Sequence, residues 1–547
     1  MGGKAIEIFM FKKTFAFILT LCLIVLTASG CGSKNKDSES YVQNVTQPAK
    51  ITTKLKKLNM GKWLYNKKNK FFYQIGIDYC EKPVDRRYEQ LSVFVPEAYM
   101  NSSKNSDGTY TCKLNKKAKI KGYSADTAPI VMPVHTPGYA SDIAITADVA
   151  ANYKTLLESF SEYTSEGFVY VHAGCRGAYE GAPAGVCDLK AAIRYIRYCD
   201  ELIAGDAEKI FVYGTSGGGA QAAILGASGD SELYNPYLKA IGAVRGVSDS
   251  IAGSMDWVPI TSLDTANAEY EWMMGSTREG LSDKDKAVSD SLAKAFAQYI
   301  NKADFTDKNG NKLTLKKSEK GIFKAGSYYE YIKGVIEKSL NNYIRDNDFY
   351  DITPQEYIDT LNSDKKWINY DKKTNKATIT SVEDFTNACK RADKYPYAFD
   401  NPDTQISLFG TGNGQVLHFD KILADILTEQ NISYAKKYTS DLKKTDSLGY
   451  SVEKRLKMYT PLYYLMESRK GYKKSNVAKY WRIRSGINQS TTSLTTEVNL
   501  ALALEKYDGV KNVDFETVWE QGHTEAERKG TGAQNFIKWV KKCNKKN

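Results

Sequence analysis

The sequence has 547 residues, of which 42% are hydrophobic and 26% are charged, and its formal net charge is +12. This length accommodates one large domain with an insertion, and the hydrophobic content is ordinary for a globular protein. The positive charge comes mostly from scattered lysines, without a basic stripe of interleaved aromatic residues, so we expect no nucleic-acid partner.

The first 30 residues have the pattern of a bacterial lipoprotein signal peptide. Two lysines precede the apolar run TFAFILTLCLIVLT, which is too short for an easy membrane span and is followed by Ala-Ser-Gly-Cys. The pattern predicts cleavage before Cys31 and lipid on its thiol, which would hold the protein on the outer face of a bacterial membrane. A signal peptide cut elsewhere or an uncleaved anchor is the alternative. Met10 is an alternative to Met1 as the first residue, because the signal pattern is more regular from there.

The next segments predict a tether and then alternating strands and helices. Residues 31–58 are polar and poor in apolar side chains, which indicates a flexible tether. In residues 59–263, FFYQIGIDY and LSVFVPEAY alternate like antiparallel strands, and APIVMPVHTPGY and GFVYVHAGC are typical of buried strands. A helix is expected over 188–204 with Asp188 as its cap, and IAGSMDWVPIT predicts a further strand.

The pattern changes between residues 264 and 475, which are rich in Tyr, Lys and Asp and mostly helical in periodicity. Residues 476–547 then return to strand, helix, strand and helix, in AKYWRIRSG, SLTTEVNLALALEKY, VDFETVWEQG and NFIKWVKKC. Strands that alternate with helices predict an α/β fold with a mostly parallel sheet. We therefore expect a core from residues 59–263 and 476–547 with a large, mainly helical lid insertion at 264–475.

The stretch FVYGTSGGGAQAAIL contains a Gly-x-Ser-x-Gly motif between an expected strand and an expected helix. In a nucleophile elbow the serine lies on a strained turn, and its close-packed neighbours must lack side chains. The helix that follows points its free N–H groups at the reaction centre. The motif in this context predicts that Ser216 is a nucleophile, and a glycine-rich turn without chemistry is the alternative.

A seryl nucleophile needs a base, and the chain has only four histidines: His135, His172, His418 and His523. In α/β-hydrolases the chain order is Ser, acid, His, which leaves the last two. His418 begins an apolar helical pattern and is more typical of a packing histidine. His523 follows an expected last strand and precedes an expected last helix, where this fold places its base.

The nine cysteines form no CxxC pair, and DFTDKNGNKLTL lacks the full spacing of an EF-hand calcium loop. We therefore expect neither a metal nor a cofactor. In an exported protein Cys80–Cys112 and Cys175–Cys187 are possible disulfides, although the sequence does not fix the pairing.

The chain resembles bacterial subtype B tannases and their carboxylesterase and feruloyl-esterase relatives, which have the α/β-hydrolase fold. The resemblance rests on VHAGCRG, DLKAAIRYIRY, GTSGGGAQAAILGASGD, PITSL, EYEWMMG, AFD, YWRIRSG and VDFETVWEQGH, and it covers most of the exported part. It implies Ser216 as nucleophile and His523 as base. It also implies an oxyanion hole from the N–H of Gly217 and, in the HTPGY loop, of Gly138, since Pro137 has no N–H.

The sequence departs from this family at its acidic residues. Gln489 stands where the family has the acid that orients the base, and Thr491 stands where a second acid often lies. Gln405 stands where an acid of the substrate pocket is expected. We expect that either Asp264, after the strand that follows the elbow, supplies the third member of a triad, or that Gln489 holds the base without charge.

These features predict a serine carboxylesterase of class EC 3.1.1 that acts on acyl or cinnamoyl-type esters, either small molecules or esters attached to polysaccharide. The missing acids argue against a tannase proper, which stays an alternative. A non-catalytic binding lipoprotein on a decayed hydrolase fold is a second alternative. A serine peptidase is a third and ranks last, because the sequence shows no propeller repeats. The sequence does not indicate an oligomeric state.

Overall fold

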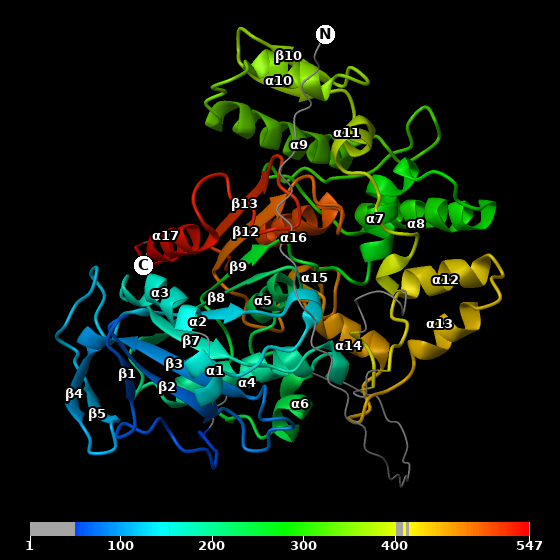
Figure 1. Cartoon of the computed structure of the whole chain (residues 1–547). Helices are drawn as coiled ribbons and strands as arrows, with labels where there is room; N and C mark the ends of the chain where they lie inside the picture. Colours follow the sequence, from blue (N-terminus) through cyan, green and yellow to red (C-terminus); the bar gives the residue numbers. More distant parts are fainter. Residues whose placement is uncertain (1–49, 153, 401–407, 412–414, 546–547) are drawn as a thin grey trace. The chain divides into compact units, whose positions relative to one another are not determined.

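The computed structural model describes residues 50–152, 154–400, 408–411 and 415–545, which form one compact unit (Figure 1). The expected signal peptide, the lipid site Cys31 and the pocket residue Gln405 lie outside the described residues. Within the described ranges, no helix has both the length and the apolar character needed to cross a bilayer.

A nine-stranded sheet forms the centre of the unit. Its first three strands pair antiparallel, and the six strands from β7 to β13 pair parallel. This arrangement confirms the predicted α/β-hydrolase fold with a mostly parallel sheet. In spatial order the strands are β1 (Leu64–Asn66), β2 (Phe71–Asp78), β3 (Gln90–Pro96), β7 (Val169–Ala173), β6 (Pro129–Val134), β8 (Asp206–Thr215), β9 (Gly253–Trp257), β12 (Tyr480–Gly486) and β13 (Asn512–Val518).

Apolar side chains on both faces of the sheet are buried under helices. Ile130 and Met132 of β6 belong to the core shared with α4 (Ala184–Tyr198), α5 (Gly217–Ala227) and α16 (Leu494–Lys506). Val131, between them, belongs to the opposite core, which α3 (Ser161–Thr164) and α17 (Gly532–Asn544) cover. Successive side chains of a strand point to opposite faces, so a strand buried on both faces is a continuous apolar run.

Helix α4 begins four residues earlier than the sequence indicates, so the prediction of Asp188 as its cap is wrong. Asp188 lies inside the helix and is fully buried. Its carboxylate accepts hydrogen bonds from the Arg176 backbone N–H at 2.9 Å and from the Arg176 guanidinium at 2.9 and 2.7 Å. A charge-assisted, bidentate pair of this kind allows a carboxylate to be buried within a helix.

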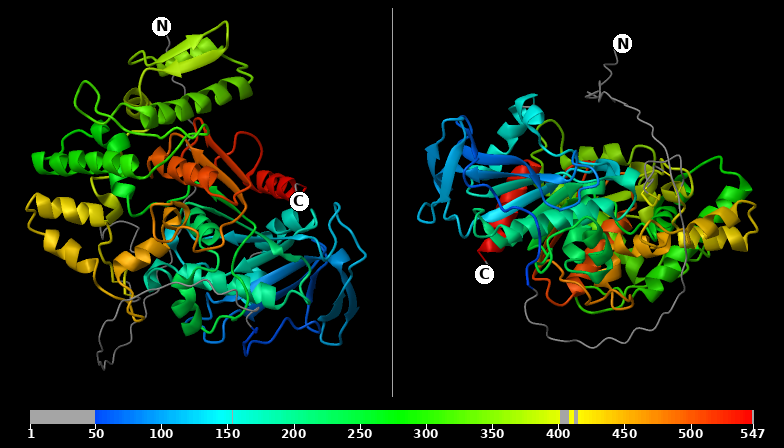
Figure 2. Two further views of the ribbon diagram at one scale, coloured as in Figure 1. Left: turned by 180° about the vertical axis from the view of Figure 1, so that it is seen from behind. Right: turned by 90° about the horizontal axis from the view of Figure 1, so that it is seen from below.

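The segment between β9 and β12 is mainly helical and adds one small antiparallel hairpin, β10–β11. Figure 2 shows its yellow helices at one end of the unit and, at the other end, the blue hairpin formed by β4 (Met100–Lys104) and β5 (Tyr110–Leu114). Its elements are α7 (Ala266–Met274), α8 (Asp283–Lys302), α9 (Ser327–Asp346), α10 (Pro354–Leu361), β10 (Ile368–Asp371), β11 (Lys376–Ile379), α11 (Val382–Cys389), α12 (Lys421–Glu429), α13 (Ala435–Asp441), α14 (Val452–Met458) and α15 (Pro461–Leu465).

Neither of the two disulfides considered from the sequence is formed. Cys80, Cys112, Cys175 and Cys187 are all buried free thiols in this structure. Burial raises the pKa of each of these thiols, which keeps them protonated and unreactive. The four cysteines therefore fill the core as small apolar side chains.

Candidate active site

The motif around Ser216 forms a strained turn between strand β8 and helix α5. Ser216 has φ 61° and ψ −121°, a backbone conformation that a residue with a side chain rarely adopts. A Cβ atom on Gly214 would lie 2.4 Å from the Gly218 carbonyl, and one on Gly218 would lie 2.1 Å from the Val134 carbonyl oxygen. Only glycine fits at these two positions, so the local geometry is that of a nucleophile elbow.

His523 lies in the loop between β13 and α17, and its ring reaches the elbow. Its Nε2 is 2.8 Å from the Ser216 Oγ, although the two residues are 307 positions apart in the sequence. This distance is that of a hydrogen bond between a hydroxyl and an imidazole that can accept its proton. The structure thus brings together the two residues that the sequence singles out.

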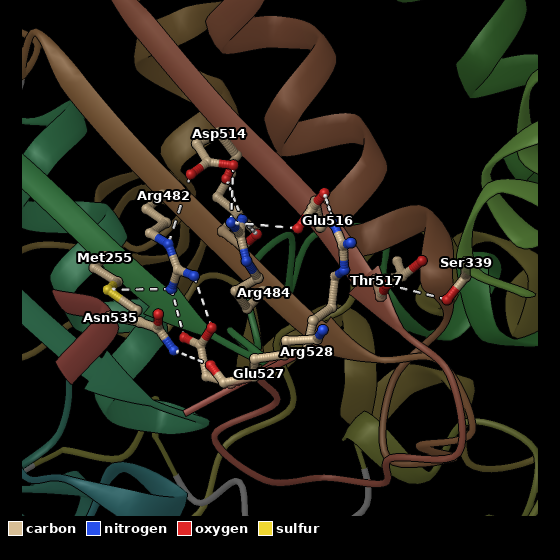
Figure 3. A network of polar contacts seen from close by, with 12 residues as sticks. Met255, Ser339, Arg482, Arg484, Asp514, Glu516, Thr517, Glu527, Arg528 and Asn535 are labelled. Atoms are coloured by element: carbon tan, nitrogen blue, oxygen red, sulfur yellow. Dashed lines mark hydrogen bonds and ion pairs between the residues drawn. The ribbon is translucent and has the colours of Figure 1, made fainter. Parts of the chain in front are cut away.

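A buried ion pair holds the loop that carries His523. The Glu527 carboxylate accepts hydrogen bonds from both terminal nitrogens of Arg482 on β12 (Figure 3). It also accepts one from the Trp257 indole N–H on β9 at 3.0 Å. The backbone carbonyl of Glu527 accepts a further bond from the Gln521 side chain at 2.9 Å. The His523 loop is therefore fixed to two neighbouring parallel strands of the sheet.

Asp264, predicted as the third member of a triad, does not reach His523. Its carboxylate pairs with the Arg469 guanidinium at 3.1 Å. After β9 the chain runs into helix α7 of the lid segment, and Asp264 just before that helix meets an arginine from the other end of the segment. The prediction for Asp264 is therefore corrected: its geometry is that of an ion pair within the insertion.

Gln489, the alternative third member, is buried but its amide points elsewhere. Its Nε2 donates to Thr492 Oγ1 at 2.6 Å and to Glu497 Oε1 at 3.3 Å, and its Oε1 accepts from the Thr492 backbone N–H at 3.0 Å. The other ring nitrogen of His523, Nδ1, is buried and has no hydrogen-bond partner among the described residues. Within those residues, the arrangement is a dyad.

The expected oxyanion donors lie side by side. Gly217 begins α5, in the first turn of a helix, where backbone N–H groups have no intrahelical acceptor. A Cβ on Gly217 would lie 3.1 Å from the Gly138 nitrogen, so the two glycines are in close contact. The Tyr139 N–H already donates to the Thr136 carbonyl at 2.9 Å, whereas the Gly138 N–H has no acceptor among the described residues.

The dyad opens into a cavity of about 930 Å³. Its volume lies in the range of small-molecule sites, and its walls mix aromatic rings with a few charged groups. Thr491 lines this cavity, as the resemblance implies, and so does His135. The other lining residues include Tyr139, Tyr213, Ile260, Asp393, Lys394, Tyr395, Phe399 and Glu525.

Residues 120–316, which include Ser216, match the protein-family model BD-FAE. The structure also matches the crystal structure of Fusobacterium nucleatum tannase, with a TM-score of 0.68 and 28% identity over 91% of this chain and 99% of that one. The chain has the α/β-hydrolase fold, and its structure is similar to those of bacterial tannases. A search of curated proteins gave no significant match.

Two further structural matches are also tannin acyl hydrolases. The native tannin acyl hydrolase from Lactobacillus plantarum has a TM-score of 0.65 and 25% identity over 86% of this chain and 94% of that one. A tannin acyl hydrolase in complex with ethyl gallate has a TM-score of 0.64 and 25% identity over the same shares of the two chains. The comparisons support an ester hydrolase.

A buried pair of opposite charges lies behind the dyad of the hydrolase. Lys390 is 1% exposed and donates to the Gln489 backbone carbonyl, and Glu497 is fully buried beside it. Burial lowers the pKa of Lys390 to about 8 and raises that of Glu497 to about 7. Burial, followed by the positive charges of Lys390 and Lys394, lowers the pKa of His523 to about 4. The base therefore stays neutral at physiological pH.

The sequence gives no signal for Lys390, Lys394, Glu497 or Glu525 as members of the site. Lys390 and Lys394 stand in the polar stretch ACKRADKYPY, which has the composition of a solvated loop. Glu497 stands in the first turn of α16, where acidic residues are common for reasons of helix stability. Only the packing of the insertion against β12 and β13 makes these groups part of one site.

Among the described residues, one cluster outside the dyad has the donors of a metal site. It consists of His135, Asp142 and His172, whose potential ligand atoms all lie within 4.8 Å of one another. His135 is also part of the cavity wall.

Proposed function

We propose that the protein is a serine carboxylic-ester hydrolase that works through an acyl-enzyme. The observation that carries this proposal is the 2.8 Å contact between His523 Nε2 and Ser216 Oγ at a strained elbow. A serine hydroxyl is a weak nucleophile until an adjacent base accepts its proton. The α/β-hydrolase fold and the tannase matches support the same reaction class.

Each step of the reaction has a group in the right place. Ser216 Oγ attacks the ester carbonyl while His523 Nε2 takes its proton, and the N–H groups of Gly217 and Gly138 stabilise the oxyanion. His523 then gives the proton to the leaving alcohol oxygen, which leaves an ester on Ser216. Water, activated by the same nitrogen, releases the acid and restores the hydroxyl.

The dyad is expected to be slower than a full triad. An acid next to the base fixes its tautomer and stabilises the imidazolium as it forms, and its replacement by an amide in a serine protease costs about 10⁴ in turnover. Here Nδ1 of His523 has no partner among the described residues, and the charges that lower its pKa are those of Lys390 and Lys394. This observation also favours the second candidate function, a non-catalytic binding protein on a decayed hydrolase fold.

We further propose acyl or aromatic, cinnamoyl-type esters as the substrates, either small or attached to polysaccharide. Tyr395, Phe399 and Tyr139 give the cavity aromatic surface for such an acyl group. A galloyl group needs hydrogen-bond acceptors for its hydroxyls, and the sequence has Thr491 and Gln405 where acids are expected. Methyl gallate should therefore be a poorer substrate than simple acyl esters or methyl ferulate.

Active-site labelling and a matched variant test the proposal. A fluorophosphonate probe should label the wild-type protein and not Ser216→Ala, and the variant should lose ester hydrolysis while it keeps the wild-type circular dichroism spectrum. A p-nitrophenyl ester series beside methyl gallate and methyl ferulate then ranks the substrates. Absence of labelling in folded wild-type protein would favour the binding protein, and efficient hydrolysis of methyl gallate would favour a tannase proper.

A further inference from the structure

We propose that His135, Asp142 and His172 form a binding site for a zinc ion at the edge of the active-site cavity. Two imidazoles and one carboxylate are the donors that zinc takes in sites with an open fourth position. Rigid elements supply them. His172 lies on β7, and His135 directly follows the neighbouring parallel strand β6.

Asp142 is held next to these histidines by its own backbone. Its N–H donates to the Cys175 carbonyl at 2.9 Å, and its carbonyl accepts from the Cys175 N–H at 3.0 Å. Cys175 lies two residues after the end of β7, so this bridge ties the loop after β6 to the strand that carries His172. The three donors therefore converge before any ion arrives.

The oxygen and nitrogen atoms that could bind an ion face one another without direct hydrogen bonds between them. The Oδ2 atom of Asp142 lies 3.8 Å from His172 Nε2 and 4.0 Å from His135 Nδ1. Both separations are too long for a hydrogen bond. Zinc bonds of about 2.0–2.2 Å place the donors of a tetrahedral site about 3.4 Å apart, so the two pairs with Asp142 need to close by roughly 0.4 and 0.6 Å.

Two buried atoms of the cluster have no hydrogen-bond partner among the described residues. They are Asp142 Oδ2 and His172 Nδ1, and the whole of His172 is only 4% exposed. A buried polar atom without a partner costs free energy, and an ion bound at Asp142 Oδ2 would recover that cost for the carboxylate. The Nε2 atom of His172 is also 3.0 Å from the Ile143 carbonyl oxygen, so a zinc ion bound at this nitrogen replaces that hydrogen bond and the ring proton moves to Nδ1.

The cluster is open to the active-site cavity on the side of His135. The side chain of His135 is 47% exposed, which leaves an approach for the ion from the cavity.

The site is separate from the dyad in its ligands but adjoins the oxyanion loop. His135 is three residues before Gly138, and both line the same cavity. An ion held by His135 would tie this loop to β7. Binding itself requires neither Ser216 nor His523, so the proposal stands independently of the proposed esterase function.

Zinc binding to the full exported chain tests the site. Isothermal titration with zinc, with calcium as a control ion, should give one zinc site per chain and no calcium binding, because calcium prefers oxygen donors. His135→Gln and Asp142→Asn should each weaken zinc affinity at least about tenfold, the lower end of the losses seen even for residues that only orient ligands. Asp126→Asn, an exposed aspartate paired with Lys116, serves as the matched control and should bind like wild type.

Two variants of the dyad separate this site from zinc bound at the catalytic histidine. His523→Ala and Ser216→Ala should both keep the wild-type zinc affinity. Loss of binding in His523→Ala with full binding in Asp142→Asn would overturn the proposal, as would absence of zinc binding by the wild-type protein. Circular dichroism of each variant excludes misfolding as the cause of lost binding.

Discussion

His523 shows how the surroundings of one residue set the pH range of a reaction. Its burial and the positive charges of Lys390 and Lys394 all disfavour the protonated ring, and its pKa falls to about 4. A base must be unprotonated to accept a proton, so activity is lost as the pH falls through this pKa. We expect the acid limb of kcat/KM near pH 4, instead of near pH 6.5, when an uncharged aryl ester is assayed from pH 3.5 to 8.

A change at Lys390 should move that limb. Lys390→Met removes a buried positive charge, so protonation of His523 becomes easier and the acid limb should shift to higher pH. Lys437→Met, at an exposed lysine of α13, is the control and should leave the profile unchanged. An acid limb at the same pH in Lys390→Met and in wild type would contradict this electrostatic coupling.

Asp264 illustrates a residue whose role follows from its partner. Because it pairs with Arg469 and does not reach His523, Asp264→Asn should change kcat less than about threefold. The variant should still lose about 1–3 kcal/mol of unfolding free energy, since it leaves a partly buried guanidinium without its charge partner. Urea denaturation and steady-state kinetics on the same preparation check both numbers. A large fall in kcat at unchanged stability would restore Asp264 to the catalytic site.

At the scale of elements, the loop from β13 to α17 positions the base through its anchor at Glu527. Glu527 and Arg482 form a buried bidentate pair, and breaking one partner of such a pair typically costs about 3–5 kcal/mol. Glu527→Gln should therefore lower stability by an amount of this order. It should also lower kcat, because the loop then holds His523 less firmly against Ser216.

Two measurements separate these effects of Glu527→Gln. Unfolding in urea gives the free-energy change, and kcat measured well below the unfolding transition gives the loss of positioning. Lys529→Gln, an exposed residue of the same loop, is the control and should match wild type in both. If kcat of Glu527→Gln equals that of wild type under native conditions, the pair stabilises the fold without positioning the base.

At the scale of the whole molecule, we propose that a lipid on Cys31 holds the protein at the outer face of the membrane. Cys31→Ala should release the protein to the medium or leave an uncleaved precursor. The reason is that Cys31 is part of both the predicted cleavage site and the predicted point of lipid attachment. Fractionation of cells and mass spectrometry of the mature amino terminus measure the outcome. A wild-type mature chain that starts at a residue other than Cys31 would exclude the lipoprotein.

The sequence by itself determined the alternation of strands and helices in the core, the elbow at Ser216 and the choice of His523 as its partner. These features have local causes: apolar runs form buried strands, only glycine fits beside the elbow, and few histidines stand in a position that the chain order allows. The same local reasoning placed the helix cap at Asp188, where the helix had already begun.

Only the tertiary structure decided which charged groups meet. Lys390 contacts Gln489 across 99 positions, and Asp264 finds Arg469 across 205. His135, Asp142 and His172 come together because β6 and β7 are parallel neighbours that end at the same edge of the sheet. These contacts produce no periodic pattern in the sequence, because they depend on how the lid insertion and the strands pack against one another. Whether His523 has a third partner also depends on such contacts, which is why the sequence could offer Asp264 and Gln489 as candidates but could not choose between them.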